Sequence, residues 1–412
     1  MALFVRTLYF FLILSTQVYA NLQIGVGKID ITPPIGTPSA GYADRKGASM
    51  EGMHDPLLAI ALFIDNGEKQ IVLCSVDHLG FTYEMVQEVI QRAHLIPRLE
   101  TCEIYIGSSH THSGGGAFLN IPFVGEFLAG TYDPDVTHLY IQRTVEAITI
   151  ASQKAIPAQI GIGYGKTENL SYYRSPCPIG LSPSSDVAVI KVTKLDGSPL
   201  AVLFNYAVHP TVLRSSNRLF SADFVGYARD QIQSLLGENV QALYFNGAQG
   251  DINPVIFNEH DRFASCQTLG HSLAETVVSM WGHIATKETL DIHTQKETYS
   301  FKPQSTPQGL KLSLERYQSE INLIVLNKKQ AFVTIPGELS TFYDQKLKAV
   351  ANEYGYDQIS ILGLTNDAHG YILSPESWRH PTFESSLSFG GEHYGSEIYN
   401  QAINLLKGLR KL

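Results

Sequence analysis

The chain has few cysteines, and their positions exclude one common kind of metal site. Its 412 residues include only four, at Cys74, Cys102, Cys177 and Cys266. No two of them form a Cys-x-x-Cys pair, which argues against a structural zinc ribbon. Cys74 and Cys102 lie in apolar, strand-like runs, as buried thiols do, whereas an exported protein can also form disulfides. The sequence leaves the pairing open.

The chain also lacks an excess of positive charge. Asp and Glu number 39 against 30 Lys and Arg, which gives a formal net charge of -9. A protein that binds nucleic acid usually carries a basic surface, so we expect no nucleic-acid partner. No segment after residue 20 is apolar for long enough to cross a membrane, and there is no internal repeat or low-complexity block.

The first twenty residues have the pattern of a secretory signal peptide. Arg6 supplies the positive start, residues 8–14 form a short apolar core, and Val18-Tyr19-Ala20 ends in a small residue. We expect cleavage after Ala20 and a secreted or periplasmic protein. The alternative is an N-terminal membrane anchor. Residues 21–412 are then expected to form a single catalytic domain.

Strand-like and helix-like segments alternate through the rest of the chain. Mixed order of this kind predicts an α/β (mixed α+β) fold, with β-sheets flanked by helices and an active site in loops at strand ends. A polar stretch at residues 287–313 suggests a boundary or an excursion. The expected strands are residues 59–64, 70–76, 102–107, 159–164, 187–192, 201–206, 242–245, 321–326 and 331–335, and the expected helices are 83–94, 137–154, 225–236 and 264–285.

The most informative motif is His110-Thr111-His112, followed by Gly114-Gly115-Gly116. Residues two apart on an extended backbone face the same way, so both imidazoles can enter one small space. Glycines allow a substrate to approach the backbone closely. The pattern suggests a metal ligand with an acid/base histidine beside it, whereas two ordinary loop histidines are the alternative.

Several other strand-like runs end in residues that can ligate metal or transfer protons. Strand ends that feed loops are where active sites of mixed α/β proteins gather. Packing alone accounts poorly for so many of them. They are Val76-Asp77-His78, Val208-His209-Pro210, Gly250-Asp251 and Pro336-Gly337-Glu338.

Taken together and in order, these motifs resemble the catalytic domain of the neutral/alkaline non-lysosomal ceramidases. The resemblance runs from Gly25 to about Gly395. It rests on many short motifs, each weak alone: Gly25-Val26-Gly27-Lys28-Ile29-Asp30-Ile31-Thr32-Pro33, Gly52-Met53-His54-Asp55, His110-Thr111-His112-Ser113-Gly114, Tyr173-Arg174-Ser175-Pro176, Ala207-Val208-His209-Pro210-Thr211, Ser221-Ala222-Asp223, Gly250-Asp251-Ile252-Asn253-Pro254, Pro336-Gly337-Glu338 and Gly370-Tyr371.

The resemblance implies a zinc-dependent amidase with one Zn²⁺ per chain. By motif, the zinc ligands of the family fall on His110, His209, Glu338 and Tyr371. His112 matches the acid/base residue of the family, and Arg174 matches an arginine that contacts the reacting amide. The implied reaction is hydrolysis of the N-acyl bond of ceramide.

The chemistry is coherent without the family name. Zinc accepts imidazole and carboxylate ligands and lowers the pKa of its water to about 7. A guanidinium such as Arg174 can stabilise negative charge on the carbonyl oxygen, and His112 can deliver a proton to the leaving amine. Asp223 or Asp251 is a candidate to orient a ligating histidine.

The sequence departs from the family pattern at the substrate site. Asn253 stands where the family has a serine, tyrosines that position substrate cannot be placed in residues 378–383, and no C-terminal β-sandwich domain follows. We therefore expect amide hydrolysis more firmly than ceramide as substrate. The expected partner is a lipid-like N-acyl amide with peripheral membrane contact; acyl length and oligomeric state are not predicted.

Three other functions compete with a ceramidase. One is an amidase of the same family with another substrate, and one is a catalytically weak lipid- or glycan-binding relative. A metallophosphoesterase also uses a His-x-His motif, but that motif usually comes late in the chain, whereas His110 comes early and no Asp-x-His precedes it.

Overall fold

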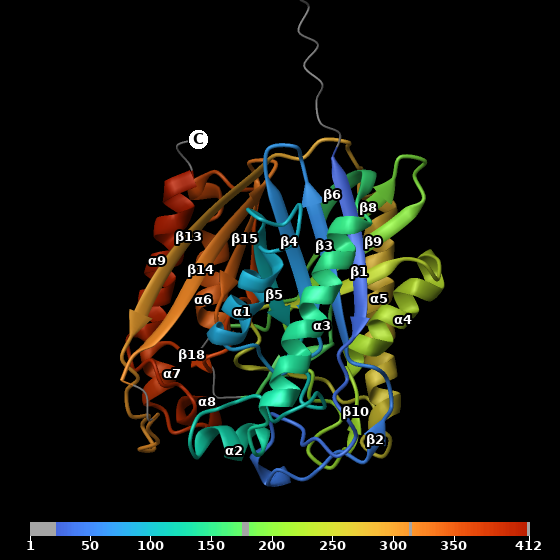
Figure 1. Ribbon diagram of the computed structural model, residues 1–412. Helices are drawn as coiled ribbons and strands as arrows, with labels where there is room; N and C mark the ends of the chain where they lie inside the picture. The colour runs from blue at the N-terminus through green and yellow to red at the C-terminus, as the bar shows by residue number, and fades with distance from the viewer. Residues whose placement is uncertain (1–21, 175–180, 313–314, 410–412) are drawn as a thin grey trace, which may run out of the picture.

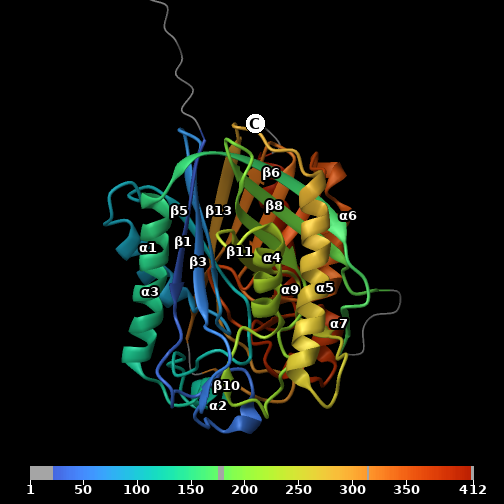
Figure 2. The same cartoon turned by 90° about the vertical axis from the view of Figure 1, so that its right-hand side faces the viewer.

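Two halves of one large sheet and a second sheet make up the interior, with helices outside. The computed structural model describes residues 22–174, 181–312 and 315–409; the predicted signal peptide, Ser175, Pro176 and Cys177 lie outside this range. Figure 2 shows the layers edge-on, with α1 and α3 on one side of the strands and α4 and α5 on the other. The predicted mixed α/β class is confirmed.

The larger sheet has eight strands in the order β11-β9-β8-β6-β1-β3-β4-β5. It bends at its middle, since β1 pairs with β6 only through two residues, and β11 packs against β3, β4 and β5. Buried aliphatic side chains fill the space between the two halves. The strands are β1 (Gln23–Asp30), β3 (Leu58–Asp65), β4 (Gln70–Val76), β5 (Glu103–Ser108), β6 (Ile156–Lys166), β8 (Asp186–Lys194), β9 (Pro199–Tyr206) and β11 (Gln241–Asn246).

Helices cover both outer faces of this sheet. On one face lie α1 (Tyr83–Ala93) and α3 (Pro134–Gln153), and on the other α4 (Phe224–Leu236) and α5 (Arg262–His283). The backbone of α3 lies directly on β1, since a Cβ added to Gly27 would come within 2.0 Å of the Ala147 carbonyl oxygen. Glycine at this position therefore sets the close helix–sheet contact.

The second sheet has four strands in the order β13-β14-β15-β17 and carries its own helices. The polar stretch at residues 287–313 contains β13, which pairs along its length with β14 and begins the second sheet. The elements are β13 (Ile292–Phe301), β14 (Tyr317–Leu326), β15 (Gln330–Ile335), β17 (Gln358–Gly363), α6 (Thr341–Ala349) and α9 (Tyr394–Leu409).

Short elements gather at one end of the molecule, in the lower half of Figure 1. Three two-stranded ribbons, β2–β10, β7–β12 and β16–β18, lie among the loops. They are β2 (Gly52–Met53), β7 (Ser171–Tyr173), β10 (Leu219–Phe220), β12 (Ile252–Pro254), β16 (Glu338–Leu339) and β18 (Tyr371–Ile372), with helices α2 (Val124–Ala129), α7 (Pro375–Arg379), α8 (Phe383–Ser386) and η1 (Ala43–Arg45). Another short helix, η2 (Asn352–Tyr354), comes between α6 and β17 and contacts Lys407 of α9.

The strands and helices expected from the sequence are all present, with small shifts at their ends. Cys74, Cys102 and Cys266 are buried free thiols. Within the described ranges, none of the helices combines the length and the apolar character needed to span a bilayer.

Candidate active site

The two histidine loops follow β5 and β9, which lie in different halves of the larger sheet, and one side chain joins them. His110 comes two residues after β5, and His209 three residues after β9. The amide nitrogen of Asn246, at the end of β11, donates to the carbonyl oxygens of Ser109 and Val208 at 3.0 and 3.1 Å. These are the residues immediately before His110 and His209, so Asn246 fixes the two loops relative to each other.

Glu338 and Tyr371 reach the same place from the second sheet. They follow β15 and β17 and are direct register partners in the parallel ribbon β16–β18. Neighbouring residues in such a ribbon project their side chains to the same face, so the carboxylate and the phenol point together. The site therefore draws on both sheets.

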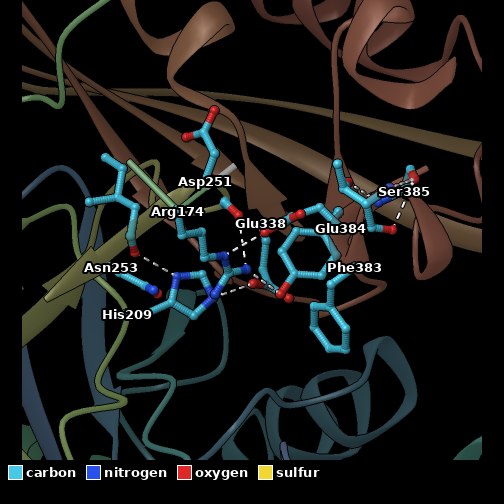
Figure 3. Close-up of polar contacts among 12 residues, drawn as sticks. Arg174, His209, Asp251, Asn253, Glu338, Phe383, Glu384 and Ser385 are labelled. Carbon is cyan, nitrogen blue, oxygen red and sulfur yellow. Dashed lines mark hydrogen bonds and ion pairs between the residues drawn. The ribbon is translucent and has the colours of Figure 1, made fainter. Parts of the chain in front are cut away.

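Three histidines and a carboxylate converge on one buried point. The Nε2 atoms of His110 and His209 lie 3.3 and 2.8 Å from Glu338 Oε2. His112 Nε2 lies 3.3 Å from His110 Nε2. One ring nitrogen from each histidine lies within 4.8 Å of the others, so the buried group His110, His112 and His209 can hold a metal ion. Figure 3 shows His209 beside Glu338.

The outer ring nitrogens show that two of these histidines are oriented as metal ligands. His110 Nδ1 donates to the carbonyl oxygen of Leu79 at 2.6 Å, and His209 Nδ1 donates to that of Ile252 at 3.0 Å. A proton on Nδ1 leaves the lone pair on Nε2, which faces the common point. The donor set therefore fits a divalent ion such as zinc.

Asp223 and Asp251 do not orient these histidines, so the prediction that one of them does is wrong. Asp223 caps α4 and accepts hydrogen bonds from the main-chain N–H groups of Phe224 and Leu213. Asp251 accepts from the hydroxyl of Thr341 at 2.7 Å. The main-chain carbonyls of Leu79 and Ile252 orient the two histidines instead.

His112 is held differently from the other two histidines. Its Nδ1 is buried and has no hydrogen-bond partner in the described part of the chain. The ring instead packs edge-on against Tyr42, with centroids 4.7 Å apart, and Gly41 touches its other side. Arg45 donates to its main-chain carbonyl. The backbone is thus fixed, while the imidazole keeps nitrogen atoms available for proton transfer.

Burial and mutual proximity set the charge state of the cluster. Burial lowers the pKa of His209 to about 4. Burial and the neighbouring His110 and His209 lower the pKa of His112 as well. Burial opposes ionisation of Glu338, but its contacts with His110 and His209 hold the pKa of its carboxyl well below the usual range. Neutral imidazoles and an ionised carboxylate are the forms that ligate metal.

Arg174 and Tyr371 form a second, connected contact. Arg174 Nη2 donates to Tyr371 Oη at 2.6 Å and to the Gly250 carbonyl at 3.1 Å, while its Nε donates to Glu384 Oε1 at 2.6 Å. Figure 3 shows Arg174 between Asp251 and Glu384. The Tyr371 ring stacks over His209 at 6.5 Å. Arg174 thus places a fixed positive charge beside the metal-capable group.

An apolar pocket opens on one side of the cluster. His110, His112, Glu338 and Tyr371 lie at its polar end, and it has an empty volume of about 950 Å³. Apolar side chains make up most of its lining, among them Phe118, Leu119, Ile121, Leu364, Leu387 and Phe389.

A polar pocket opens on the other side. It shares Gly41, His112 and Phe383 with the apolar pocket, and Arg174 also lines it. Asn253, whose role the sequence left open, lies here beside Tyr172. A substrate whose reacting bond lies at His112 would therefore place one part in the apolar pocket and its other part in the polar pocket.

Sequence reasoning missed three residues that complete the site. Asn246 carried a weak signal, since an amide ends a strand just before Gly247. Gly41 lies 71 residues before His112, and their contact is visible only in space. Glu384, the partner of Arg174, lies 210 residues away and had no local signal.

Comparisons with known proteins agree with the geometry. The family profile described as neutral/alkaline non-lysosomal ceramidase, N-terminal, matches residues 22–269. Neutral ceramidase A of Dictyostelium discoideum is 30% identical over 225 residues, 51% of this chain and 31% of that protein. Neutral ceramidase of Drosophila pseudoobscura pseudoobscura is 28% identical over 229 residues, 51% of this chain and 32% of that protein. The matches span about a third of these relatives.

The fold agrees over a longer range. The crystal structure of neutral ceramidase from Pseudomonas aeruginosa superposes with a TM-score of 0.83 over 95% of this chain and 75% of that one, at 14% identity. Because the family profile covers more than half of the sequence, the chain belongs to the neutral/alkaline non-lysosomal ceramidase family.

Proposed function

We propose that this protein is a zinc-dependent hydrolase that cleaves the N-acyl amide bond of ceramide or a related lipid amide. The observation that carries the proposal is the meeting of His110, His209 and Glu338 at one buried point, with His112 beside them. Family membership gives the reaction class, and the apolar pocket is suited to an acyl chain.

The residues around the cluster divide the chemical work. Zinc held by His110, His209, Glu338 and Tyr371 would supply a water of lowered pKa, about 7. His112, neutral at physiological pH, takes the proton of the attacking water and passes it to the leaving nitrogen. Arg174 offers its guanidinium to the carbonyl oxygen as negative charge develops there; losing such a donor typically costs about 2.7–4 kcal/mol.

Two substitutions test the division between ligand and acid/base residue. His110→Ala should lose both bound zinc and hydrolysis, whereas His112→Ala should keep zinc and lose turnover. Metal content per chain and hydrolysis of an N-acyl sphingoid amide are measured on the same preparations. Normal hydrolysis by the His110 variant would refute the metal mechanism, and a wild-type protein that binds lipid without cleaving it would favour the binding function.

We also propose that the protein is exported and contacts a membrane at its periphery. Export rests on the signal-peptide pattern of residues 1–20. The contact rests on α2: Val124 and Leu128 line the apolar pocket, while Phe123 and Phe127 are 86% and 57% exposed. Sedimentation with lipid vesicles should fall for Phe123→Ser with Phe127→Ser, but not for the control Leu95→Ser, which is also exposed. If the double variant sediments with vesicles as well as the wild type does, the exposed side of α2 is not the membrane contact.

A further inference from the structure

The polar pocket carries more positive charge than its acidic residues can neutralise. Two arginines line it, Arg174 and Arg214, against one carboxylate, Glu384. Arg174 already binds that carboxylate through its Nε. One guanidinium is therefore left without an anionic partner inside the pocket.

Arg214 is that guanidinium. Its side chain is exposed and makes no ion pair with any residue that the structure describes. Its backbone has a φ of 60°, in the left-handed region that only few non-glycine residues adopt. A long, charged side chain at the rim of a pocket beside the reacting group is available to a ligand.

The side chain of Arg45 holds the loop that carries Arg214 in place. Buried Arg45 donates from Nη2 to the Arg214 carbonyl at 3.0 Å and from Nε to the Ser215 carbonyl at 3.1 Å. Among the described residues, its hydrogen-bond acceptors are carbonyl or hydroxyl oxygens, so Arg45 adds a positive charge beside the loop that carries Arg214. The nearby Asp44 accepts from the Ser215 hydroxyl and does not line the pocket.

Neutral side chains make up most of the remaining lining. Asn253, Thr211, Thr382, Tyr172 and Tyr42 offer hydrogen-bonding groups, and Pro254, Ile256 and Phe383 add apolar surface. In Figure 3, Asn253 lies on the far side of His209 from Phe383. The pocket thus combines an unpaired guanidinium with neutral polar groups, the usual composition of a carboxylate or phosphate site.

We propose that this pocket binds an anionic group, a carboxylate or a phosphate, on the amine half of the substrate, and that Arg214 determines this specificity. The inference rests on the proposed amide hydrolysis at the same site. In the reaction, the carbon–nitrogen bond breaks, water oxygen joins the acyl carbon, and protons pass to nitrogen. The products are a fatty acid and an amine that bears the anionic group.

The test compares pairs of substrates with the same acyl chain, of which one bears an anionic group on its amine half and the other a neutral group. N-lauroylglycine and N-lauroylethanolamine have the same acyl chain but end in a carboxylate or a hydroxymethyl group. Both are used below their micelle concentration, so that no lipid surface contributes. Ceramide phosphate against ceramide, in neutral detergent, forms a second pair that distinguishes a phosphate source from a carboxylate source.

We expect the wild-type protein to prefer the anionic member of at least one pair in kcat/KM. Arg214→Gln should reduce that preference roughly tenfold, mainly through KM, as expected for loss of a charge-assisted hydrogen bond. Added salt should shrink the wild-type preference, because exposed charges are screened. The control Arg218→Gln removes the same charge from the same loop, but Arg218 pairs with Glu51 and does not line the pocket. Its preference should equal that of the wild type.

The failures of the two proposals are distinguishable. Hydrolysis of neutral and anionic amides with equal efficiency, or a preference that Arg214→Gln leaves unchanged, overturns the anion specificity while amide hydrolysis stands. Failure of the zinc-loaded wild type to hydrolyse any of the four substrates overturns the proposed function and this inference with it.

Discussion

Adding one methyl group at Gly41 should disable His112 without touching any metal ligand. Gly41 is buried with a φ of +95°, and a Cβ built there would lie 2.4 Å from His112 Nδ1 and 2.7 Å from its Cγ. Contacts this short do not occur, so in Gly41→Ala the imidazole must shift by more than half an ångström, taking a contact limit of ~3.0 Å. A misplacement of about 1 Å can cost roughly 10²-fold in rate. We expect kcat to fall by about that factor while zinc content is unchanged.

Gly36 provides the matched control. It has a similar φ of +102°, but no described atom lies within 4 Å of an added Cβ. An alanine at either position must adopt a positive φ that L-residues rarely take, at a cost of about 1–3 kcal/mol. Urea unfolding should therefore show a loss of stability in both variants, larger in Gly41→Ala because of its added steric contact, whereas hydrolysis should fall strongly only in Gly41→Ala. Equal activity of the two variants, with zinc retained in both, would refute the assigned position of His112.

Three further predictions concern the pocket, the loops and the core. Lengthening the acyl chain should raise kcat/KM until the apolar pocket is full, by up to about 0.8 kcal/mol, or roughly fourfold, per methylene; a flat series would contradict this use of the pocket. Asn246→Ala removes the hydrogen bonds to the main-chain carbonyls that precede His110 and His209, and zinc titration should show roughly 10–100-fold weaker binding. An unchanged zinc affinity would show that the two loops keep their positions without Asn246. Burial lowers the pKa of His78 to about 3, below its unfolded value of about 6.5, so its stabilising contribution is complete above pH 6.5 and is lost as the pH falls toward 3. The difference in unfolding free energy between wild type and His78→Asn should therefore narrow from pH 7 to pH 4, and a constant difference would be evidence against this cause.

Local patterns in the sequence were sufficient for the elements that form the larger sheet. Period-two and period-3.6 patterns predicted β3, β4 and β5 and the helices α1 and α3. They did not predict β13, because six of its ten residues carry charged or hydroxyl groups and few of its side chains are buried. A strand at the edge of a sheet meets fewer apolar neighbours, so the sequence pattern there is weak.

The sequence predicted the site residues whose side chains have a distinctive chemical type. The prediction failed where the partner of a site residue is a main-chain group. A histidine that follows a strand can be recognised in the sequence as a candidate ligand. The main-chain carbonyls of Leu79 and Ile252, which accept hydrogen bonds from His110 and His209, cannot be told from other carbonyls in the sequence. Asp251 was a reasonable candidate by type, but Thr341 binds it instead. Only the path of the chain in space decides between such partners.

An ion at this point would also join residues that the two sheets position. His110 and His209 follow strands of the larger sheet, while Glu338 and Tyr371 belong to a ribbon that extends the smaller one. Binding free energy gained only in the folded state adds directly to stability, by about 1.4 kcal/mol for each tenfold excess of free zinc over its dissociation constant. The melting temperature should thus climb as zinc is titrated in, because the bound ion ties the loops of the larger sheet to the ribbon beside the smaller one.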